Sequence, residues 1–200
     1  MADNKVDGIN ALGVSAAKLK GTPGCPVPEK KARWKTKQLE ICRFTLNGDP
    51  VQVAVPVHWT LLEMLRYKLG YTGTKQGCDK GDCGSCTIRV NGDPMLSCII
   101  PSMAAEGASI QTIEDLGSRS HPLVEAFEMN GAAQCGFCIP GMLMSAVSYL
   151  EEEQKKQLPT VTKEGISKAL SGNLCRCTGY TKILLAVEKA WEQMQGNPDE

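Results

Sequence analysis

The stretch Gln76-Gly-Cys-Asp-Lys-Gly-Asp-Cys-Gly-Ser-Cys86, followed by Cys98, decides the fold of the first half of this 200-residue chain. Its cysteines follow the spacing C-x4-C-x2-C with one distant cysteine, which is the plant-type arrangement for a [2Fe–2S] cluster. Each iron takes two thiolates, so a short loop has to curl around the cluster. Gly77, Gly81 and Gly84 permit that path, because glycine adopts positive φ angles and allows close backbone approach. The sequence therefore predicts one cluster with four cysteine ligands: Cys78, Cys83, Cys86 and Cys98.

A structural zinc site is the alternative for this stretch, because zinc also accepts four cysteines. Zinc sites generally pair two short C-x2–4-C segments. Here three cysteines share one loop and the fourth stands alone. The spacing therefore favours the two-iron cluster over zinc.

A second group of cysteines forms two short pairs later in the chain. Gln134-Cys-Gly-Phe-Cys138 holds a C-x2-C pair, and Asn173-Leu-Cys-Arg-Cys-Thr-Gly-Tyr180 holds a C-x-C pair. Each pair lies next to an expected helix end, where unpaired N–H groups and the helix dipole favour an anionic cluster. Spacing alone leaves a four-cysteine zinc site or a redox-active C-x2-C pair open. We expect a second [2Fe–2S] cluster on four ligands: Cys135, Cys138, Cys175 and Cys177.

The cysteine content of the whole chain supports metal ligation. Ten cysteines in a chain without a recognisable export signal are hard to explain as disulfides, because the cytosol keeps thiols reduced. The two histidines, His58 and His121, lie far from the cysteine groups, which disfavours mixed Cys/His zinc fingers and Rieske clusters. We therefore expect a cytoplasmic protein with sulfur ligands.

Neither charge nor hydropathy indicates a nucleic-acid or membrane partner. Lys plus Arg (22) equals Asp plus Glu (22), so the overall charge does not indicate nucleic acid or an anionic membrane. No apolar run approaches the roughly 18 residues that a membrane-spanning helix needs. We expect no membrane span.

Periodicity divides the chain into an N-terminal arm (1–38), a β-rich domain (39–116) and a helical domain (117–196). The arm ends in a basic stretch and is expected to be solvated, or to dock on a partner subunit through Trp34. Alternating residues and two Asn-Gly turns predict strands at 41–46, 51–55, 87–90, 95–100 and 109–113, with a helix over 60–69. Helical periodicity then predicts four helices, which begin near residues 122, 140, 163 and 181. The expected fold class is α+β, a small mixed sheet followed by a helical bundle.

Three motifs together resemble the iron–sulfur subunit of the xanthine oxidase family of molybdenum hydroxylases. They are Gly77–Cys86, Gln134–Met142 and Gly172–Tyr180, and the resemblance covers about residues 39 to 195. The family includes xanthine dehydrogenases, carbon monoxide dehydrogenases, aldehyde oxidoreductases and 4-hydroxybenzoyl-CoA reductases. The resemblance implies a plant-type ferredoxin-like (β-grasp) domain followed by a four-helix-bundle [2Fe–2S] domain.

The resemblance also implies partners and an order of clusters. A large subunit would bind molybdopterin, and a flavin subunit with FAD, or another acceptor, would take the electrons at the other end. The cluster on Cys135, Cys138, Cys175 and Cys177 would lie nearer molybdenum, and the plant-type cluster nearer the flavin. Gln134 and Cys177 match positions that lie against the pterin in relatives.

Three functions compete on this basis: an electron-transfer subunit of a heteromeric oxidoreductase, a free-standing two-cluster ferredoxin, and a zinc-stabilised interaction module. No nucleophile arrangement and no dinucleotide fingerprint is found, so no substrate-transforming site is expected on this chain. Diffusing ferredoxins are often strongly acidic, whereas this chain has zero formal net charge, which favours the subunit.

Cys25 and Cys42 match no ligand position. Cys42 is expected to be a small core or surface residue and Cys25 a free thiol.

Overall fold

A computed structural model describes residues 38–196 of the chain. Almost all of the predicted arm, including Cys25 and Trp34, lies outside the described residues, as do residues 197–200. No helix within residues 38–196 is long and apolar enough to cross a membrane.

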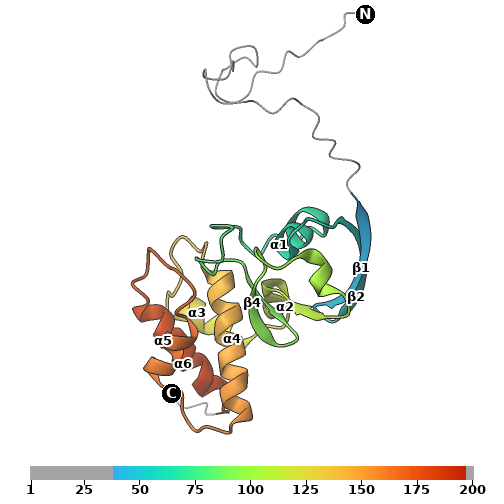
Figure 1. Cartoon of the computed structure of the whole chain (residues 1–200). Helices are drawn as coiled ribbons and strands as arrows, with labels where there is room; N and C mark the ends of the chain where they lie inside the picture. Colours follow the sequence, from blue (N-terminus) through green and yellow to red (C-terminus); the bar gives the residue numbers. More distant parts are fainter. Residues whose placement is uncertain (1–37, 197–200) are drawn as a thin grey trace, which may run out of the picture. The chain divides into compact units, whose positions relative to one another are not determined.

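The first half of the described chain forms a five-stranded mixed sheet with the strand order β2-β1-β5-β3-β4 (Figure 1). β1 pairs antiparallel with β2 and parallel with β5, while β3 pairs antiparallel with β4 and β5. Asn47-Gly48 and Asn91-Gly92 close the two hairpins with positive φ at all four residues, as a two-residue hairpin turn requires. The predicted mixed sheet and both turns are confirmed. The strands are β1 (Leu39–Leu46), β2 (Asp49–Pro56), β3 (Thr87–Val90), β4 (Asp93–Leu96) and β5 (Ser109–Gln111).

A helical segment covers one face of this sheet. It begins as α1 (Leu61–Glu63), where the Thr60 side chain accepts from the Glu63 N–H and the Glu63 carboxylate accepts from the Thr60 N–H. It continues as a π-helical turn, η2 (Met64–Lys68), in which the Leu69 N–H reaches the Met64 carbonyl. The predicted helix over 60–69 is therefore present, but its second half is π-helical.

Two other sequence predictions need correction. The strand predicted over 95–100 lies at β4 (Asp93–Leu96), so Cys98 lies in the turn after the strand and not on it. The turn forms because the Ser97 hydroxyl donates to the Cys86 carbonyl and the Ser97 carbonyl accepts from the Leu62 N–H. A short 3-10 helix, η3 (Ser102–Ala105), follows this turn. The strand predicted over 109–113 ends at Gln111 and gives way to α2 (Ile113–Ser118).

The second half of the described chain is helical, as predicted. Its buried core includes Leu123, Met142, Val147 and Ile183, which come from three of the helices. The helices are α3 (Pro122–Met129), α4 (Ile139–Lys155), α5 (Lys163–Ala169) and α6 (Thr181–Met194). The predicted α+β fold is confirmed, with a sheet domain followed by a helical domain.

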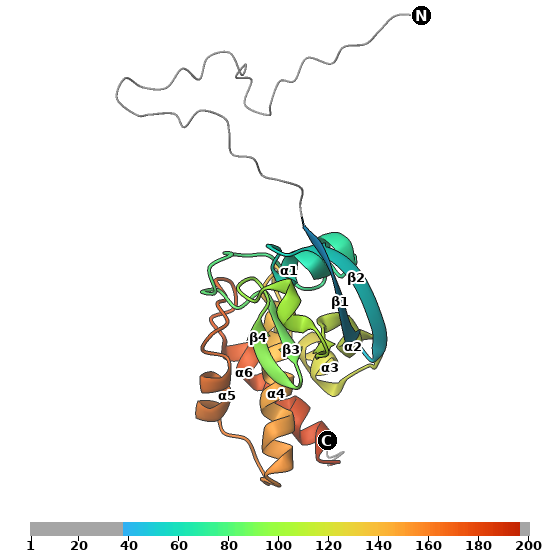
Figure 2. The same ribbon diagram turned by 45° about the vertical axis from the view of Figure 1, so that its right-hand side comes forward.

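Strands β3 and β4 lie alongside α4 (Figure 2), where the sheet domain meets the helical domain. Arg89 of β3, almost fully buried, forms an ion pair with Glu151 of α4. Its Nη1 atom lies 3.0 Å from the Glu151 Oε1 atom. This ion pair holds the C-terminal half of α4 against β3.

Candidate metal centres

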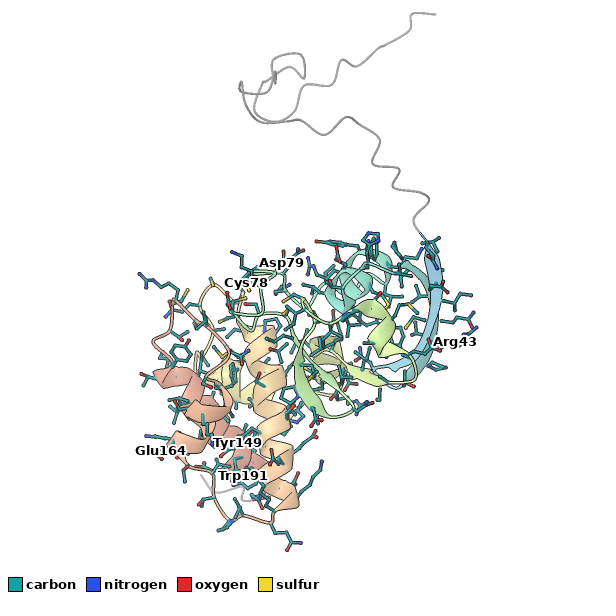
Figure 3. All side chains as sticks on the ribbon, viewed as in Figure 1. Arg43, Cys78, Asp79, Tyr149, Glu164 and Trp191 are labelled. Carbon is teal, nitrogen blue, oxygen red and sulfur yellow. The ribbon has the colours of Figure 1, made fainter. Side chains whose placement is uncertain are left out.

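The loop between η2 and β3 carries three of the four cysteines of the first group. Gly81 and Gly84 adopt φ angles of +82° and +72°, so they turn the chain as the sequence predicted. A Cβ atom added at Gly77 would lie 2.7 Å from the Cys83 sulfur, which shows how closely the loop curls around its cysteines. Figure 3 labels Cys78 and Asp79 in this loop.

Backbone N–H groups of the loop point at the Cys78 sulfur. The Lys80 and Asp82 N–H groups each donate to it at 3.4 Å. These bonds, with that of Lys80 the strongest, lower the pKa of the Cys78 thiol to about 7. Because a thiolate is the form that ligates metal, the loop favours the ligating state of this cysteine.

The other half of the first group is buried. Cys86 and Cys98 are 2% and 7% exposed and pack against Leu62 and Leu96. Burial, followed by the neighbouring Cys86, raises the pKa of the Cys98 thiol to about 12. Without a metal, burial keeps this thiol protonated, whereas a metal would remove the proton on ligation. The sulfurs form two close pairs, Cys78 with Cys83 and Cys86 with Cys98.

The second group lies at two helix ends. Cys138 is the N-cap residue of α4, and Cys175 and Cys177 lie in the turn before α6. The Cys135 and Cys177 sulfurs are 3.5 Å apart, and the Cys138 and Cys175 side chains are within hydrogen-bonding reach of each other. The helix-end positions predicted from the sequence are confirmed, and the four sulfurs again form two pairs.

The two pairs of the second group differ in exposure. Cys138 is buried, and burial raises the pKa of its thiol to about 12. Burial also raises the pKa of Cys175. This influence is outweighed by hydrogen bonds from the Thr178 hydroxyl and from the Thr178 and Cys177 N–H groups, so the net pKa of Cys175 is lowered. Cys135 and Cys177 are exposed, and so is the neighbouring Gln134. One side of this group therefore faces the protein and the other faces outward.

The loops of the two cysteine groups are joined through the backbone. The Leu174 N–H donates to the Cys83 carbonyl at 2.9 Å. The buried Asn173 side chain donates from Nδ2 to the Gly84 carbonyl at 3.0 Å, and its Oδ1 atom accepts from the Ser145 hydroxyl at 2.8 Å. The residue next to Cys175 is thus hydrogen-bonded to a cysteine of the first group.

The paired arrangement fits a two-iron cluster. Each iron of a [2Fe–2S] cluster takes two thiolates, so four ligands are expected in two pairs. A zinc ion would instead need all four sulfurs within about 2.3 Å of one point. The pairs of sulfurs in each group therefore suit a [2Fe–2S] cluster, and the N–H groups that donate to Cys78 add hydrogen bonds at the first of them.

Several residues around these groups were not singled out by sequence reasoning. Asn173, Thr178 and Tyr180 lie within a quoted motif, but their contacts depend on the folded loop. Gly141 contacts Gly84 from the first turn of α4, so closely that an added Cβ would lie 2.2 Å from the Gly84 carbonyl oxygen. The only signal in the sequence was that these residues stood inside or next to the cysteine motifs.

Cys42 and one cavity lie outside the two cysteine groups. Cys42 is fully buried in β1, and burial raises the pKa of its thiol to about 11, so it is a core residue as predicted. A cavity of about 730 Å³ lies between the β3–β4 turn, α4 and α5. None of the eight motif cysteines lines it, so it is separate from the candidate metal centres.

Comparison with known proteins agrees with this description. One family model, described as a 2Fe-2S iron-sulfur cluster binding domain, matches residues 44–111. A second, described as a [2Fe-2S] binding domain, matches residues 112–188.

Individual relatives cover most of the described chain. The nicotinate dehydrogenase small FeS subunit of Eubacterium barkeri is 41% identical over 152 residues, which are 75% of this chain and 94% of that one. The nicotine 6-hydroxylase small subunit of Paenarthrobacter nicotinovorans is 47% identical over 143 residues, 71% of this chain and 84% of that one. A chain of quinoline 2-oxidoreductase from Pseudomonas putida 86 superposes with a TM-score of 0.73 at 41% identity, covering 80% of this chain and 99% of that chain.

Proposed function

The chain belongs to the iron–sulfur subunits of the xanthine oxidase family of molybdenum hydroxylases, and on this premise we propose how its cysteines serve electron transfer. It is the electron-transfer subunit of a heteromeric oxidoreductase whose large subunit binds molybdopterin. When bound, the two [2Fe–2S] clusters supply one-electron relay sites between the molybdenum site and an acceptor. The free-standing ferredoxin is not favoured, because the relatives are subunits of larger enzymes.

The proposal assigns four ligands to each cluster. Cys78 and Cys83 would hold one iron of the first cluster, and Cys86 and Cys98 the other. Cys135 with Cys177, and Cys138 with Cys175, would hold the second cluster. The observation that carries this assignment is the grouping of the eight sulfurs into four close pairs. The hydrogen bond from the Leu174 N–H to the Cys83 carbonyl supports direct transfer between the two groups.

The second group is proposed to face the molybdenum-binding subunit. Cys135 and Cys177 are exposed, and so are the nearby apolar side chains of Phe137 and Leu174 (48% and 56%). Exposed apolar side chains beside a redox site are suited to burial against a partner. Gln134, exposed beside Cys135, and Cys177 would then contact the pterin.

The first group is proposed to face the electron acceptor. Cys78 and Cys83 are partly exposed, and the neighbouring Tyr67 and Ile99 are 57% and 58% exposed. A flavin-binding subunit that carries FAD is the acceptor we propose for this side.

We place the division between the plant-type domain (39–116) and the helical domain (117–196) close to α2 (Ile113–Ser118), which connects β5 to the helices. None of the nine cysteines within residues 38–196 is in a disulfide, which suits the reducing cytoplasm, and we propose that compartment for the complex.

The first test is metal and sulfide analysis of the complex purified without oxygen. Two clusters require about four irons and four acid-labile sulfides per chain, with two S = 1/2 EPR signals on dithionite reduction. Zinc in place of iron, with no reducible signal, would overturn the proposal.

The ligand assignment is tested by Cys175→Ala. This variant is expected to lose one EPR signal and about half of the iron, and to stop turnover with any acceptor on the flavin side. Cys42→Ala is the matched control, because Cys42 is a buried cysteine outside both groups. The control should keep both signals. Normal iron content and turnover in Cys175→Ala would contradict the assignment.

A further inference from the structure

The turn that follows Cys177 holds a hydroxyl against a sulfur of the second group. The Thr178 Oγ1 atom lies 3.2 Å from the Cys175 Sγ atom. The same Oγ1 atom accepts the Tyr180 N–H at 3.1 Å. One side-chain hydroxyl therefore lies between a cysteine sulfur and a backbone donor.

The direction of the hydrogen bond to the sulfur follows from its chemistry. A hydroxyl has one proton and two lone pairs. The Tyr180 N–H can only donate, so it occupies a lone pair of Thr178 Oγ1 and leaves the hydroxyl proton available. A ligating cysteine is a thiolate and has no proton to give. The Thr178 hydroxyl therefore donates to the Cys175 sulfur.

The backbone of the turn is built in an uncommon conformation that keeps this hydroxyl in place. Gly179 and Tyr180 adopt φ angles of +61° and +67°, and Tyr180 is one of the few non-glycine residues in the left-handed region. The Tyr180 side chain returns to the cysteine loop, where its hydroxyl accepts the Cys175 N–H at 2.8 Å and donates to the Asn173 carbonyl at 3.0 Å. Such conformations persist where the surroundings determine them and are common at functional sites.

From this geometry we infer that Thr178 tunes the second cluster: its hydroxyl, oriented by the Tyr180 N–H, raises the reduction potential of the cluster held by Cys135, Cys138, Cys175 and Cys177. A hydrogen bond to a ligand sulfur withdraws negative charge and so favours the state with one more electron. The inference rests on the proposed function, because it requires a cluster at this group.

The two cysteine groups differ in how such bonds are supplied. At the first group, the donors to the Cys78 sulfur are the backbone N–H groups of Lys80 and Asp82, which no side-chain substitution removes. At the second group, a side chain supplies a donor to Cys175. A substitution at Thr178 therefore shifts one potential and leaves the other unchanged.

The test is an EPR-monitored redox titration of the whole complex, comparing the wild type with Thr178→Val and Thr178→Ser. The step measured is the gain of one electron by each cluster, from dithionite, with no bond formed or broken. Thr178→Val keeps the shape of the side chain and removes the hydroxyl. In this variant the ratio of reduced to oxidised second cluster at a fixed potential should fall about tenfold, which corresponds to a reduction potential about 59 mV lower for a one-electron couple. Thr178→Ser keeps the hydroxyl and should match the wild type, and the first signal should not move in either variant.

A matched control is Thr162→Val, because the Thr162 hydroxyl also accepts a backbone N–H but caps α5 away from the cysteines. It should leave both potentials unchanged. An unchanged second potential in Thr178→Val with full iron content would overturn the inference. If Thr178→Val loses iron, Thr178→Ala removes the hydroxyl without placing a methyl group beside the sulfur. If Thr178→Val and Thr178→Ala both lose iron while Thr178→Ser keeps it, the hydroxyl is required to hold the cluster. That result would also overturn the inference that the hydroxyl tunes the reduction potential. A wild-type complex without a second signal would instead refute the proposed function.

Discussion

At the scale of single residues, Asn173 is a buried polar side chain that lies between the two cysteine groups. It is 4% exposed, and its amide joins the Gly84 carbonyl to the Ser145 hydroxyl. One side chain thereby connects the first cysteine loop, α4 and the loop of the second group. A buried amide whose oxygen and nitrogen are both hydrogen-bonded fixes the positions of the segments that it joins, because moving one of them leaves buried polar atoms without partners.

Asn173→Ala is therefore expected to destabilise the chain by about 1–3 kcal/mol, the usual cost of leaving buried polar groups unpaired. The measurement is the midpoint of urea unfolding, monitored through the loss of the visible absorbance of the clusters. Ser171→Ala is the control, since the exposed Ser171 hydroxyl bonds only to the Lys168 carbonyl within its own turn. Equal midpoints for Asn173→Ala and the wild type would show that the amide does not hold the loops together.

At the scale of elements, the first turn of α4 is fitted to the loop before β3 through two glycines. A Cβ at Gly141 would lie 2.2 Å from the Gly84 carbonyl oxygen, and one at Gly84 would lie 2.3 Å from the Gly172 carbonyl oxygen. These contacts bring three backbone segments together where the two cysteine groups meet. Only glycine allows this approach.

Gly141→Ala should destabilise the chain by roughly 1–3 kcal/mol, because α4 has to move away from the loop. Helix propensity alone would favour alanine by about 1 kcal/mol. The close contact with the Gly84 carbonyl therefore decides whether Gly141→Ala stabilises or destabilises the chain. Gly117→Ala in α2, where nothing lies within 4 Å of the added Cβ, is the matched control and should be neutral or stabilising. Thermal unfolding of both variants measures the difference. Similar changes in the two variants would refute the close-contact argument.

The start of α3 provides a prediction on pH. The His121 Nδ1 atom accepts the Leu123 N–H and so caps the helix in its unprotonated form. Burial is the largest influence on the pKa of His121 and lowers it; Glu151 and Asp115 raise it and Arg89 lowers it, with a net decrease. The unfolded chain therefore binds a proton at higher pH than the folded chain. Stability due to this residue is complete above about pH 6.5 and is lost as pH falls below that value toward the folded pKa.

His121→Asn keeps a capping acceptor and removes the titration. The free energy of unfolding of this variant should fall less between pH 7.5 and 5 than that of the wild type, as measured by urea unfolding across that range. His58→Asn, at an exposed histidine, is the control. A slope in His121→Asn as steep as in the wild type would assign the acid sensitivity to other groups.

At the scale of the whole described chain, a line of polar side chains joins the sheet domain to the helical domain. Arg89 on β3 contacts Gln111 at the end of β5 and Glu151 on α4. Gln111 in turn donates to Asp115 of α2, which pairs with Arg119. Arg89 is 7% exposed, so its charge depends on these partners.

Glu151→Gln should destabilise the joined domains by roughly 1–3 kcal/mol, below the cost of breaking a fully buried pair because about a third of the Glu151 side chain is exposed. The measurement is differential scanning calorimetry, which should also show the two domains beginning to unfold separately. Glu152→Gln is the control, because Glu152 pairs with Lys156 on the surface of the same helix, and it should have no measurable effect. A single unchanged transition in Glu151→Gln would show that other contacts join the domains.

The sequence by itself determined the local features of this protein. Turn chemistry at Asn47-Gly48 and Asn91-Gly92, helical periodicity after residue 120 and the spacing of eight cysteines depend on neighbouring residues, so they can be read along the chain. The same reasoning misplaced Cys98, because a hydrogen bond from the distant Leu62 helps to end the strand early.

Only the tertiary structure decided which cysteines pair and how the two groups meet. Cys135 pairs with Cys177 across 42 positions, and Leu174 reaches Cys83 across more than ninety. Such contacts depend on where α4 packs against β3, which follows from the shapes of two separate cores and from close backbone approach at Gly84 and Gly141. No local pattern encodes that approach, because the sequence does not show whether a glycine faces solvent or lies against another backbone segment.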